Sequence, residues 1–238
     1  MPEAPAKELL SISNLHAHYG ESHILHGIDL SVRQGELVTL LGRNGAGRTT
    51  ILKSILGLVE RRTGSIRVAG QETIKLPPFR IARLGVGYCP EERGIFSRLN
   101  VEENLLLPPI IKSGGMSLTE IYELFTNLLE RKKSMGTSLS GGEQQMLAMA
   151  RILRTGADLL LLDEITEGLA PVIVQALGKL IRQLKKRGFT IILVEQNFHF
   201  AADLADRHYV VDHGTIVEMI PMEALGASMD RLSGYLGV

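Results

Sequence analysis

The sequence predicts an α/β fold organised around a parallel sheet that is buried on both faces. The main observation is Leu159–Glu164, LLLLDE, in which four leucines without polar alternation precede two carboxylates. A continuous apolar run of this kind is typical of a central strand in a parallel sheet. The second observation is Glu36–Leu41, a short apolar strand that leads into a glycine-rich loop and then a helical pattern. Ligands bind at the carboxyl ends of such strands, so both runs end where a site is expected.

The composition limits the size and the class of the protein. The 238 residues, 45% hydrophobic and 22% charged, suffice for one large core with room for a subdomain. Lysine plus arginine equals aspartate plus glutamate at 26 each, so no basic excess favours nucleic acid. No apolar run approaches the ~20 residues of a membrane span, and the N-terminal MPEAPAKE lacks the order of a signal peptide. We therefore expect a cytoplasmic protein. Cys89 is the only cysteine, which excludes an intramolecular disulfide and a cysteine metal cluster.

The N-terminal part predicts an antiparallel edge. Leu9–Leu15 and Ile24–Val32 alternate apolar and polar residues on either side of a turn around Tyr19, Gly20 and Glu21. An aromatic ring at this turn suits stacking on a flat base. Covering apolar surface at the sheet edge is the alternative role for Tyr19.

The glycine-rich loop has the context of a phosphate-binding loop, because it lies between a strand and a helix. Its glycines let backbone N–H groups approach phosphate oxygens, and the helix N-terminus attracts anions. The hydroxyl of Thr49 fits a magnesium ligand. The candidate residues are Gly42, Arg43, Asn44, Gly45, Ala46, Gly47, Arg48, Thr49 and Thr50.

Arg48 departs from the motif, which has lysine at this place. Arginine keeps the positive charge but replaces a compact ammonium with a wide planar fork, and the two are not interchangeable at a tight site. We therefore expect nucleotide binding to survive this change better than catalysis.

The middle of the chain predicts short elements. Gly64–Val68 is expected to be an edge strand, Pro77 to Leu84 a short helix, and Val86–Cys89 a core strand. A polar link begins at Glu91, and Asn104 to Gly115 has the composition of a loop. Ser117 then caps a helix with one apolar face, formed by Ile121, Leu124, Phe125, Leu128 and Leu129.

The stretch LSGGEQ, Leu139 to Gln144, predicts a helix start. Ser140 and Glu143 have the spacing of a capping box, which places Gly141 and Gly142 in the first turn of a helix that continues through Arg154. Such a start suits an anion. A plain helix cap is the usual explanation of this spacing, but the two glycines make it a less complete one here.

The C-terminal part alternates helix and strand. Val172–Arg187 is expected to be an amphipathic helix between Pro171 and Gly188. Thr190–Val194 is a buried strand that ends in Glu195, Gln196 and Asn197, again on the ligand side. His208–Asp212 and Thr215–Met219 predict a hairpin. His199, His208 and His213 lack the spacing of metal ligands, so they do not predict a metal site.

With GRNGAGRTT, LSGGEQQ and LLLLDE in this order, the chain resembles an ABC-type ATPase subunit. LSGGEQ distinguishes ABC-type ATPases from other NTPases, because a phosphate-binding loop alone occurs in many NTPases. Pro90–Leu105, Ser138–Arg151, Asp163–Pro171 and Leu193–Asn197 are similar to the ATPase subunit of branched-chain amino-acid importers and of relatives that carry urea, amides or other small polar solutes. The similarity runs from about Leu9 to the C-terminal GYLGV. It implies one ABC ATPase domain, residues 7–238. This domain has a P-loop NTPase core with a RecA-like mixed sheet, the antiparallel edge, and a helical subdomain inserted at 91–154.

The resemblance also implies roles for the candidate residues. Tyr19 stacks on adenine, and Gly42 to Thr50 hold the phosphates of ATP and Mg²⁺. Ser140, Gly141 and Gly142, with Glu143 in the same motif, cap the γ-phosphate bound to an opposite subunit. Asp163 completes the magnesium shell and Glu164 polarises the attacking water. Glu91, which would also face Mg²⁺, stands in place of a loop glutamine, and Gln196 in place of the switch histidine. Ile165, like Arg48, departs from the family, which usually has proline there.

The resemblance implies partners as well. Two ATPase subunits, in a homodimer or a heterodimer, would close head to tail on two ATP molecules. They would lie at the inner face of the cell membrane on membrane-spanning permease subunits, and a solute-binding protein would act with them indirectly.

Arg48 leaves a second function open, in which the chain is a nucleotide-binding switch that closes on ATP and leaves hydrolysis to a partner subunit. A soluble ABC ATPase of DNA repair or translation is disfavoured, because the sequence has no coiled-coil insertion, second ABC domain or basic excess. We expect no nucleic-acid partner.

Overall fold

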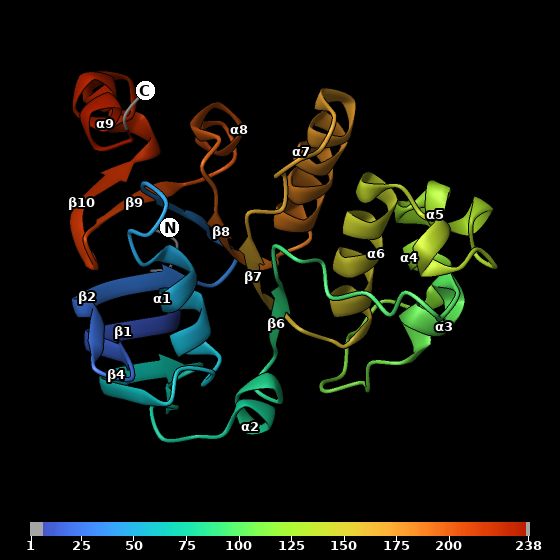
Figure 1. Cartoon of the computed structure of the whole chain (residues 1–238), viewed down its shortest axis with the longest axis horizontal. Coiled ribbons are helices and arrows are strands. Elements are labelled where there is room, and N and C mark those ends of the chain that lie inside the picture. Colours follow the sequence, from blue (N-terminus) through green and yellow to red (C-terminus); the bar gives the residue numbers. More distant parts are fainter. Residues whose placement is uncertain (1–6, 237–238) are drawn as a thin grey trace, which may run out of the picture.

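The computed structural model describes residues 7–236, which form two sheets flanked by helices (Figure 1). The predicted absence of a signal peptide concerns residues that lie mostly outside this range. The antiparallel sheet has the order β2-β1-β4-β5, and the larger sheet has the order β10-β9-β3-β8-β7-β6. The strands of the first are β1 (Glu8–Tyr19), β2 (Ser22–Arg33), β4 (Arg61–Val68) and β5 (Gln71–Glu72). Those of the second are β3 (Leu37–Leu41), β6 (Val86–Cys89), β7 (Leu159–Asp163), β8 (Thr190–Val194), β9 (Arg207–Asp212) and β10 (Thr215–Pro221).

The run of leucines forms the buried strand that the sequence predicts. β7 pairs in parallel with β6 on one side and with β8 on the other. Its side chains alternate between two cores, with Leu160 and Leu162 in one and Leu159 and Leu161 in the other. Because both faces are covered by apolar side chains, a polar residue at any of the four positions would lack water on either side.

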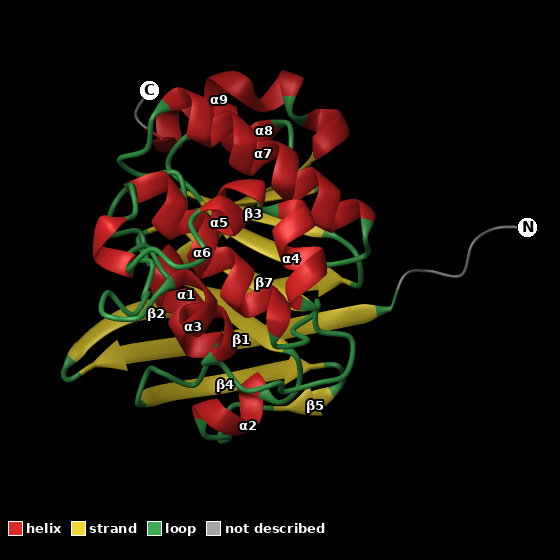
Figure 2. Cartoon of the chain, turned by 90° about the vertical axis from the view of Figure 1, so that its right-hand side faces the viewer, coloured by secondary structure: helices red, strands yellow, loops and turns green. Residues whose placement is uncertain are grey.

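Different helices cover the two faces of the larger sheet. α6 (Gly141–Arg154) and α7 (Pro171–Lys186) pack on one face, where Leu147, Leu177 and Ile181 are buried. α1 (Arg48–Ile55) lies on the other face and shares its core with the antiparallel sheet. In Figure 2 the antiparallel strands lie below and the helices α7, α8 (Phe198–Ala202) and α9 (Met229–Leu236) lie above. Both faces of the larger sheet are therefore covered, one by α6 and α7 and the other by α1 and the antiparallel sheet.

The segment from Glu91 to Arg154 contains four α-helices and a short 3-10 helix (Gly136–Ser138), and the α-helices lie together at the right of Figure 1. α3 (Val101–Leu106), α4 (Leu118–Leu124) and α5 (Thr126–Glu130) each contact α6. The buried side chain of Asn104 fixes the preceding turn, since it accepts from the Phe96 N–H and donates to the carbonyls of Phe96 and Leu99. The predicted loop is therefore wrong over Asn104 to Leu106, which belong to α3. The missed signal is Asn100, which forms a capping box with Glu103.

Two further predictions need correction. The helix capped by Ser117 is broken at Phe125, whose φ of −124° and ψ of 71° are not helical, and α5 follows. β4 is not an outer strand throughout, because β5 pairs with its end. As predicted, Glu164 follows the buried strand of leucines, and it has a φ of +47°. The remaining strands, the short helix α2 (Pro78–Ala82) and the β9–β10 hairpin confirm the predicted order of elements.

Cys89 lies in the core, as a small apolar residue does. Its Sγ accepts a hydrogen bond of 3.3 Å from Gln145 Nε2, and burial raises the pKa of the thiol to about 12. Among residues 7–236, none of the helices has the length and apolar character needed to span a membrane.

Candidate functional site

The glycine-rich loop connects β3 to α1 and presents the start of this helix. Gly47 precedes α1 with a φ of +106°, and a Cβ there would lie 2.9 Å from Leu25 Cδ2. The loop is held from outside, because the Gly214 N–H donates to the Ala46 carbonyl at 2.9 Å. The first turn of α1 has no acidic residue. Its unpaired N–H groups and the helix dipole therefore favour an anion.

A cavity of about 410 Å³ brings most of the predicted residues together. It extends from the exposed ring of Tyr19 on β1 to the end of β7. The cavity is lined by Tyr19, Ile24, Asn44, Gly45, Ala46, Gly47, Arg48, Thr49, Thr50, Glu91, Glu164, Glu167 and Gln196. Gly42 and Arg43 begin the loop but do not line the cavity, and Asp163 is buried beside it. Ile24 and Glu167 were not predicted.

Arg48 is held by three acceptors around its guanidinium group. Nη2 lies 2.8 Å from Glu164 Oε1 and 3.2 Å from Asn44 Oδ1, and Nη1 donates to the Glu195 carbonyl at 2.8 Å. The side chain is only 4% exposed. Burial lowers the pKa of Arg48, while the carboxylates of Glu164, Asp163 and Glu195 oppose that shift. Here the planar fork of arginine spans the loop and the ends of two strands, which a single ammonium group cannot do.

Glu164 is held from both sides of its carboxylate. Oε1 accepts from Arg48, and Oε2 accepts from Gln196 Nε2 at 2.9 Å. Its backbone N–H donates to the Val194 carbonyl, although a φ of +47° is unfavourable for a residue with a Cβ. Strain of this kind costs on the order of 1–3 kcal/mol and occurs often at functional sites. Ile165, which follows, is fully buried in the core.

Asp163 and Thr49 form a pair of hard oxygen donors. Thr49 Oγ1 donates to Asp163 Oδ1 at 3.0 Å, and Tyr88 Oη donates to Asp163 Oδ2 at 3.0 Å. Burial raises the pKa of Asp163, and the two hydroxyl donors act in the opposite direction. A hydroxyl and a carboxylate are ligands that suit Mg²⁺. Tyr88 was missed, although the predicted strand Val86–Cys89 carries it beside β7.

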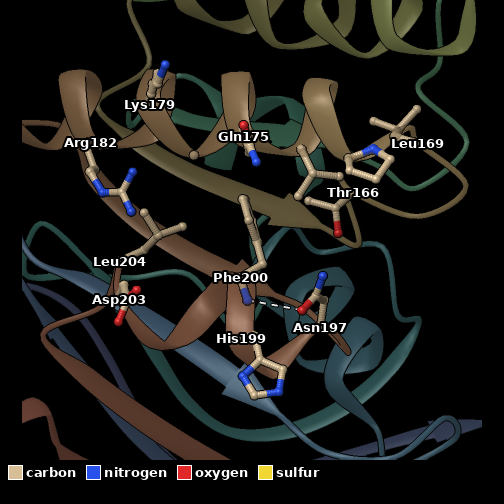
Figure 3. A pocket seen from close by; sticks show the side chains of 13 residues that line it. Thr166, Leu169, Gln175, Lys179, Arg182, Asn197, His199, Phe200, Asp203 and Leu204 are labelled. Carbon is tan, nitrogen blue, oxygen red and sulfur yellow. Dashed lines mark hydrogen bonds between the residues drawn. The ribbon is translucent and has the colours of Figure 1, made fainter.

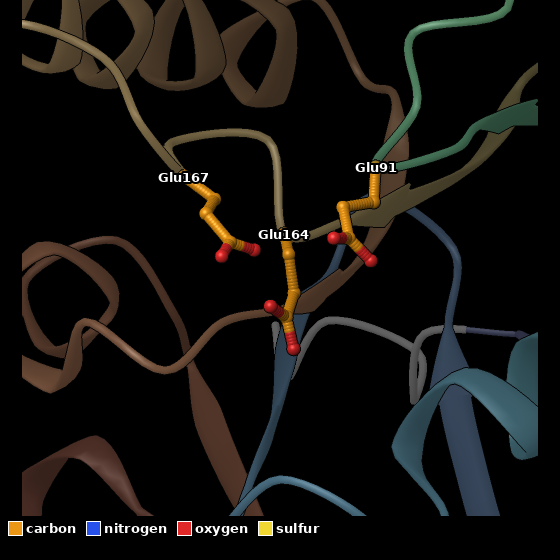
Figure 4. Close-up of side chains that lie close together, drawn as sticks. All are labelled: Glu91, Glu164 and Glu167. Carbon is orange, nitrogen blue, oxygen red and sulfur yellow. The ribbon is translucent and has the colours of Figure 1, made fainter.

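Three carboxylates face one another at the rim of this cavity (Figure 4). An oxygen of each of Glu91, Glu164 and Glu167 lies within 4.8 Å of the others. The pKa of Glu167 is raised, first through its hydrogen bond with Glu164 and then through partial burial and the charge of Glu91. Arg48 contacts this group through Glu164. The rim is therefore acidic, in contrast to the anion-binding start of α1.

The LSGGEQ stretch lies apart from this cavity. Ser140 Oγ accepts from the Glu143 N–H at 3.3 Å, and Glu143 Oε2 accepts from the Ser140 N–H at 2.7 Å, which confirms the predicted capping box. Gly142 must be small, because a Cβ would lie 2.9 Å from Ile173 Cγ2. Gly141 faces the guanidinium of Arg93. None of Ser140, Gly141, Gly142 and Glu143 lines the cavity of the phosphate-binding loop.

Glu195 was not predicted as a site residue, yet it lies at the centre of this region. Its side chain is 2% exposed and accepts from the Thr166 N–H at 3.2 Å and from Thr166 Oγ1 at 2.9 Å. Burial raises the pKa of Glu195 to about 7, despite those hydrogen bonds. Glu195 thus joins the end of β8 to the turn that follows Glu164. The sequence showed only its place at a strand end.

A larger cavity of about 590 Å³ lies between α7 and α8 (Figure 3). Phe200, Leu169 and Leu204 give it apolar walls, and Lys179 and Arg182 extend from α7. None of the predicted site residues lines it. The volume of a cavity alone therefore does not identify the functional site. The smaller cavity is the candidate because the phosphate-binding loop lines it.

The fold and the loop define a P-loop ATPase, and comparison with known proteins gives the family. A model described as ABC transporter matches residues 25–167. The chain is 41% identical to the high-affinity branched-chain amino acid transport ATP-binding protein BraG of Pseudomonas aeruginosa, covering 96% of this chain and 100% of that protein. It is 36% identical to the probable branched-chain amino acid transport ATP-binding protein LivF of Archaeoglobus fulgidus, covering 87% and 90%.

Solved structures agree with this family. An ATP-binding subunit of an ABC transporter superimposes with a TM-score of 0.82 at 27% identity, over 97% of this chain and 100% of that one. A dimeric cassette, MJ0796 with ADP and phosphate, gives 0.77 at 23% identity, over 90% and 99%, and supports the fold alone. The chain belongs to the ABC transporter family. It is the nucleotide-binding ATPase subunit of such a transporter.

Proposed function

We propose that this chain powers an importer of branched-chain amino acids or related small polar solutes. Two observations support the proposal. One cavity joins Tyr19, the phosphate-binding loop and the strand ends, and the match to BraG extends over nearly the whole chain. The identity of the solute rests on relatives, because this type of subunit drives transport without contacting the solute.

ATP is the proposed substrate of the cavity. Tyr19 provides an exposed ring for the base, and the N–H groups at the start of α1 and in the loop from Gly42 hold the phosphates. Thr49 and Asp163 would hold Mg²⁺, with Glu91 facing it, and the ion would neutralise phosphate charge. Glu164 positions the attacking water, and Gln196 orients the Glu164 carboxylate.

The complete site needs a second ATPase subunit. Ser140, Gly141 and Gly142 lie outside the cavity of their own chain, and the start of α6 suits an anion. We infer a head-to-tail pair in which each LSGGEQ stretch caps the nucleotide of the other subunit. The pair can be a homodimer or a heterodimer with a related ATPase subunit.

The helical segment 91–154 is the proposed contact to the membrane. We infer that it is a subdomain inserted in the single domain 7–238, and that it docks the chain on membrane-spanning permease subunits at the inner face of the cell membrane. The exposed side chains of Glu91 and Arg98 lie at its start. A solute-binding protein would deliver the solute to those subunits. Nucleic acid has no role in this proposal.

Arg48 favours a second candidate function, in which this chain is a slowly hydrolysing switch. Its guanidinium is engaged by Glu164, Asn44 and Glu195, so two residues near the reacting groups are tied together before ATP binds. In a heterodimer the partner's site would then perform most of the hydrolysis. Ser140→Arg should in that case reduce total ATPase activity more than Glu164→Gln does, because Ser140 serves the partner's site.

Transport by the reconstituted complex tests the proposal. The chain is co-expressed with its permease subunits, placed in vesicles with ATP inside, and supplied with solute-binding protein and labelled leucine, an amide or urea. ATP-dependent uptake of one of these solutes is expected. Charge reversal at Glu91 or Arg98 should reduce uptake, and reversal at Arg98, which does not line the nucleotide cavity, should leave ATP binding unchanged. No uptake of any of the three, from a complex that hydrolyses ATP, would refute the importer assignment.

A further inference from the structure

Four histidines gather on the outer face of the β1–β2 hairpin, next to the nucleotide cavity but outside its lining. β1 carries His16 and His18, and β2 carries His23 and His26. The antiparallel register pairs His16 with His26 and His18 with His23. The residues between them that point inward, such as Ala17 and Leu25, are buried, so the rings share the outer face. The prediction from sequence considered other histidines and missed this group, whose signal is the pairing across the turn.

The hydrogen bonds of His16 define which of its ring nitrogens carries the proton. His16 Nε2 lies 3.1 Å from Asn14 Oδ1, an amide oxygen that can only accept. Nε2 is therefore the N–H donor, and the lone pair of Nδ1 faces His23 Nε2 at 3.2 Å. In the metal-free chain His16 Nδ1 accepts a hydrogen bond from His23 Nε2, and a metal ion bound between the two nitrogens would take the place of that proton. A ring whose other nitrogen donates to a carbonyl is the usual arrangement of a metal-ligating histidine.

Asn14 is itself fixed in place. Its backbone has a φ of +47°, and its N–H donates to Asp29 Oδ1 at 3.0 Å. Gly27 leaves room for the amide, since a Cβ there would lie 3.1 Å from Asn14 Oδ1. The orientation of the His16 ring is thus set by the hairpin backbone.

The distance between the two nitrogens matches the bite of a metal ion. With metal–nitrogen bonds of about 2.0–2.1 Å, nitrogens 3.2 Å apart subtend roughly 100° at the ion, close to a tetrahedral angle. We propose that His16 and His23 form a binding site for a divalent late transition-metal ion. Among residues 7–236, no third histidine, cysteine or carboxylate brings a ligand atom within 4.8 Å of both nitrogens, so water completes the shell. Cu²⁺ binds such sites most tightly in the first-row series.

The other two rings support the His23 side chain. His18 stacks on His23 with centroids 4.1 Å apart and planes 4° apart, and His26 lies at 4.0 Å and 57°. Arg61 opposes the ion, and Glu21 acts in its favour.

An ion at this site would cross-link β1 to β2 beside the turn that carries Tyr19, three residues after His16. Metal binding should therefore raise the melting temperature of the nucleotide-free protein.

Cu²⁺ titration of untagged, nucleotide-free protein tests the site, with electron paramagnetic resonance to count nitrogen ligands. One ion per chain with two nitrogens is expected. His16→Gln and His23→Gln should each abolish this spectrum, and His199→Gln, which lies on α8, should leave it unchanged. Asn14→Gly keeps the left-handed backbone but removes the carbonyl, and should weaken binding about tenfold or more.

The proposal is overturned if the spectrum shows one nitrogen, if His16→Gln or His23→Gln binds as wild type does, or if Asn14→Gly has unchanged affinity. If the variants misfold, a measurement on the wild-type chain still tests the site. Zn²⁺ should slow modification of His16 and His23 by diethyl pyrocarbonate but not that of His199. Equal slowing at all three, or none, would equally overturn it.

Discussion

The guanidinium of Arg48 lies 2.8 Å from Glu164 Oε1 and joins the phosphate-binding loop to the proposed catalytic carboxylate. Both side chains are largely buried, at 4% and 11% exposed. Breaking such a contact leaves a charge without its partner in a poorly solvated place. The phosphates of ATP must therefore compete with the Glu164 carboxylate for the guanidinium of Arg48.

Arg48→Lys should accelerate single-turnover ATP cleavage in the reconstituted complex. Lysine cannot span Glu164, Asn44 and the Glu195 carbonyl together, so its ammonium is free for the phosphates. A displacement of about 1 Å can cost on the order of 10²-fold in rate, which sets the scale of the gain, while ATP affinity should change little. Arg43→Lys is the control in the same loop. Equal rates for wild type and Arg48→Lys would mean that the arginine is harmless.

Glu164→Gln should slow hydrolysis strongly and yield an ATP-dependent dimer, because the amide cannot polarise water. Without nucleotide the isolated variant should remain largely monomeric, since LSGGEQ has no phosphate to cap. Sedimentation with and without ATP measures this. A dimer that is equally stable in the absence of nucleotide contradicts the head-to-tail model.

Glu195→Gln should flatten the dependence of stability on pH. The pKa of Glu195 is raised to about 7 in the folded chain, so the folded state retains a proton that the unfolded chain loses near pH 4.5. The stability linked to this proton is fully present below pH 4.5 and is lost as the pH rises to about 7. Wild type should lose up to about 3 kcal/mol more than the variant over this interval. Urea denaturation at pH 4.5 and 7.5 checks this, with exposed Glu130→Gln as control. Parallel curves for wild type and Glu195→Gln would show that no such proton is bound.

Gly214→Ala should destabilise the chain more than Gly188→Ala. Both glycines have positive φ, +75° and +89°, so the backbone strain is similar. A Cβ on Gly214 would lie 1.9 Å from the Ile24 carbonyl oxygen, whereas Gly188 faces open space. We expect a further loss of about 1–3 kcal/mol at Gly214, measured by urea denaturation. Equal losses of unfolding free energy in the two variants would mean that the β9–β10 hairpin can move away from β2 without destabilising the chain.

The sequence predicted the sheet and the phosphate-binding loop because these depend on local patterns. The leucines of β7 and the glycines before α1 specify their own surroundings. The partners of Arg48 could not be predicted, since Glu164 is 116 residues away and the Glu195 carbonyl is 147 away. The break at Phe125 was missed because both sides keep a helical apolar pattern. Glu195 was missed because its role depends on burial by Thr166, which only the packing reveals.

The single thiol of the chain has a practical consequence. Cys89 is buried and protonated at neutral pH, so it should not react with maleimide or iodoacetamide reagents under native conditions. A cysteine introduced at an exposed position would then be the sole reactive thiol in an otherwise natural sequence. Fluorophores or spin labels at Ser97 and Ser22, both exposed, would report the separation between the helical segment and the β1–β2 hairpin. Movement during the ATP cycle can thus be recorded without first removing a cysteine from the core.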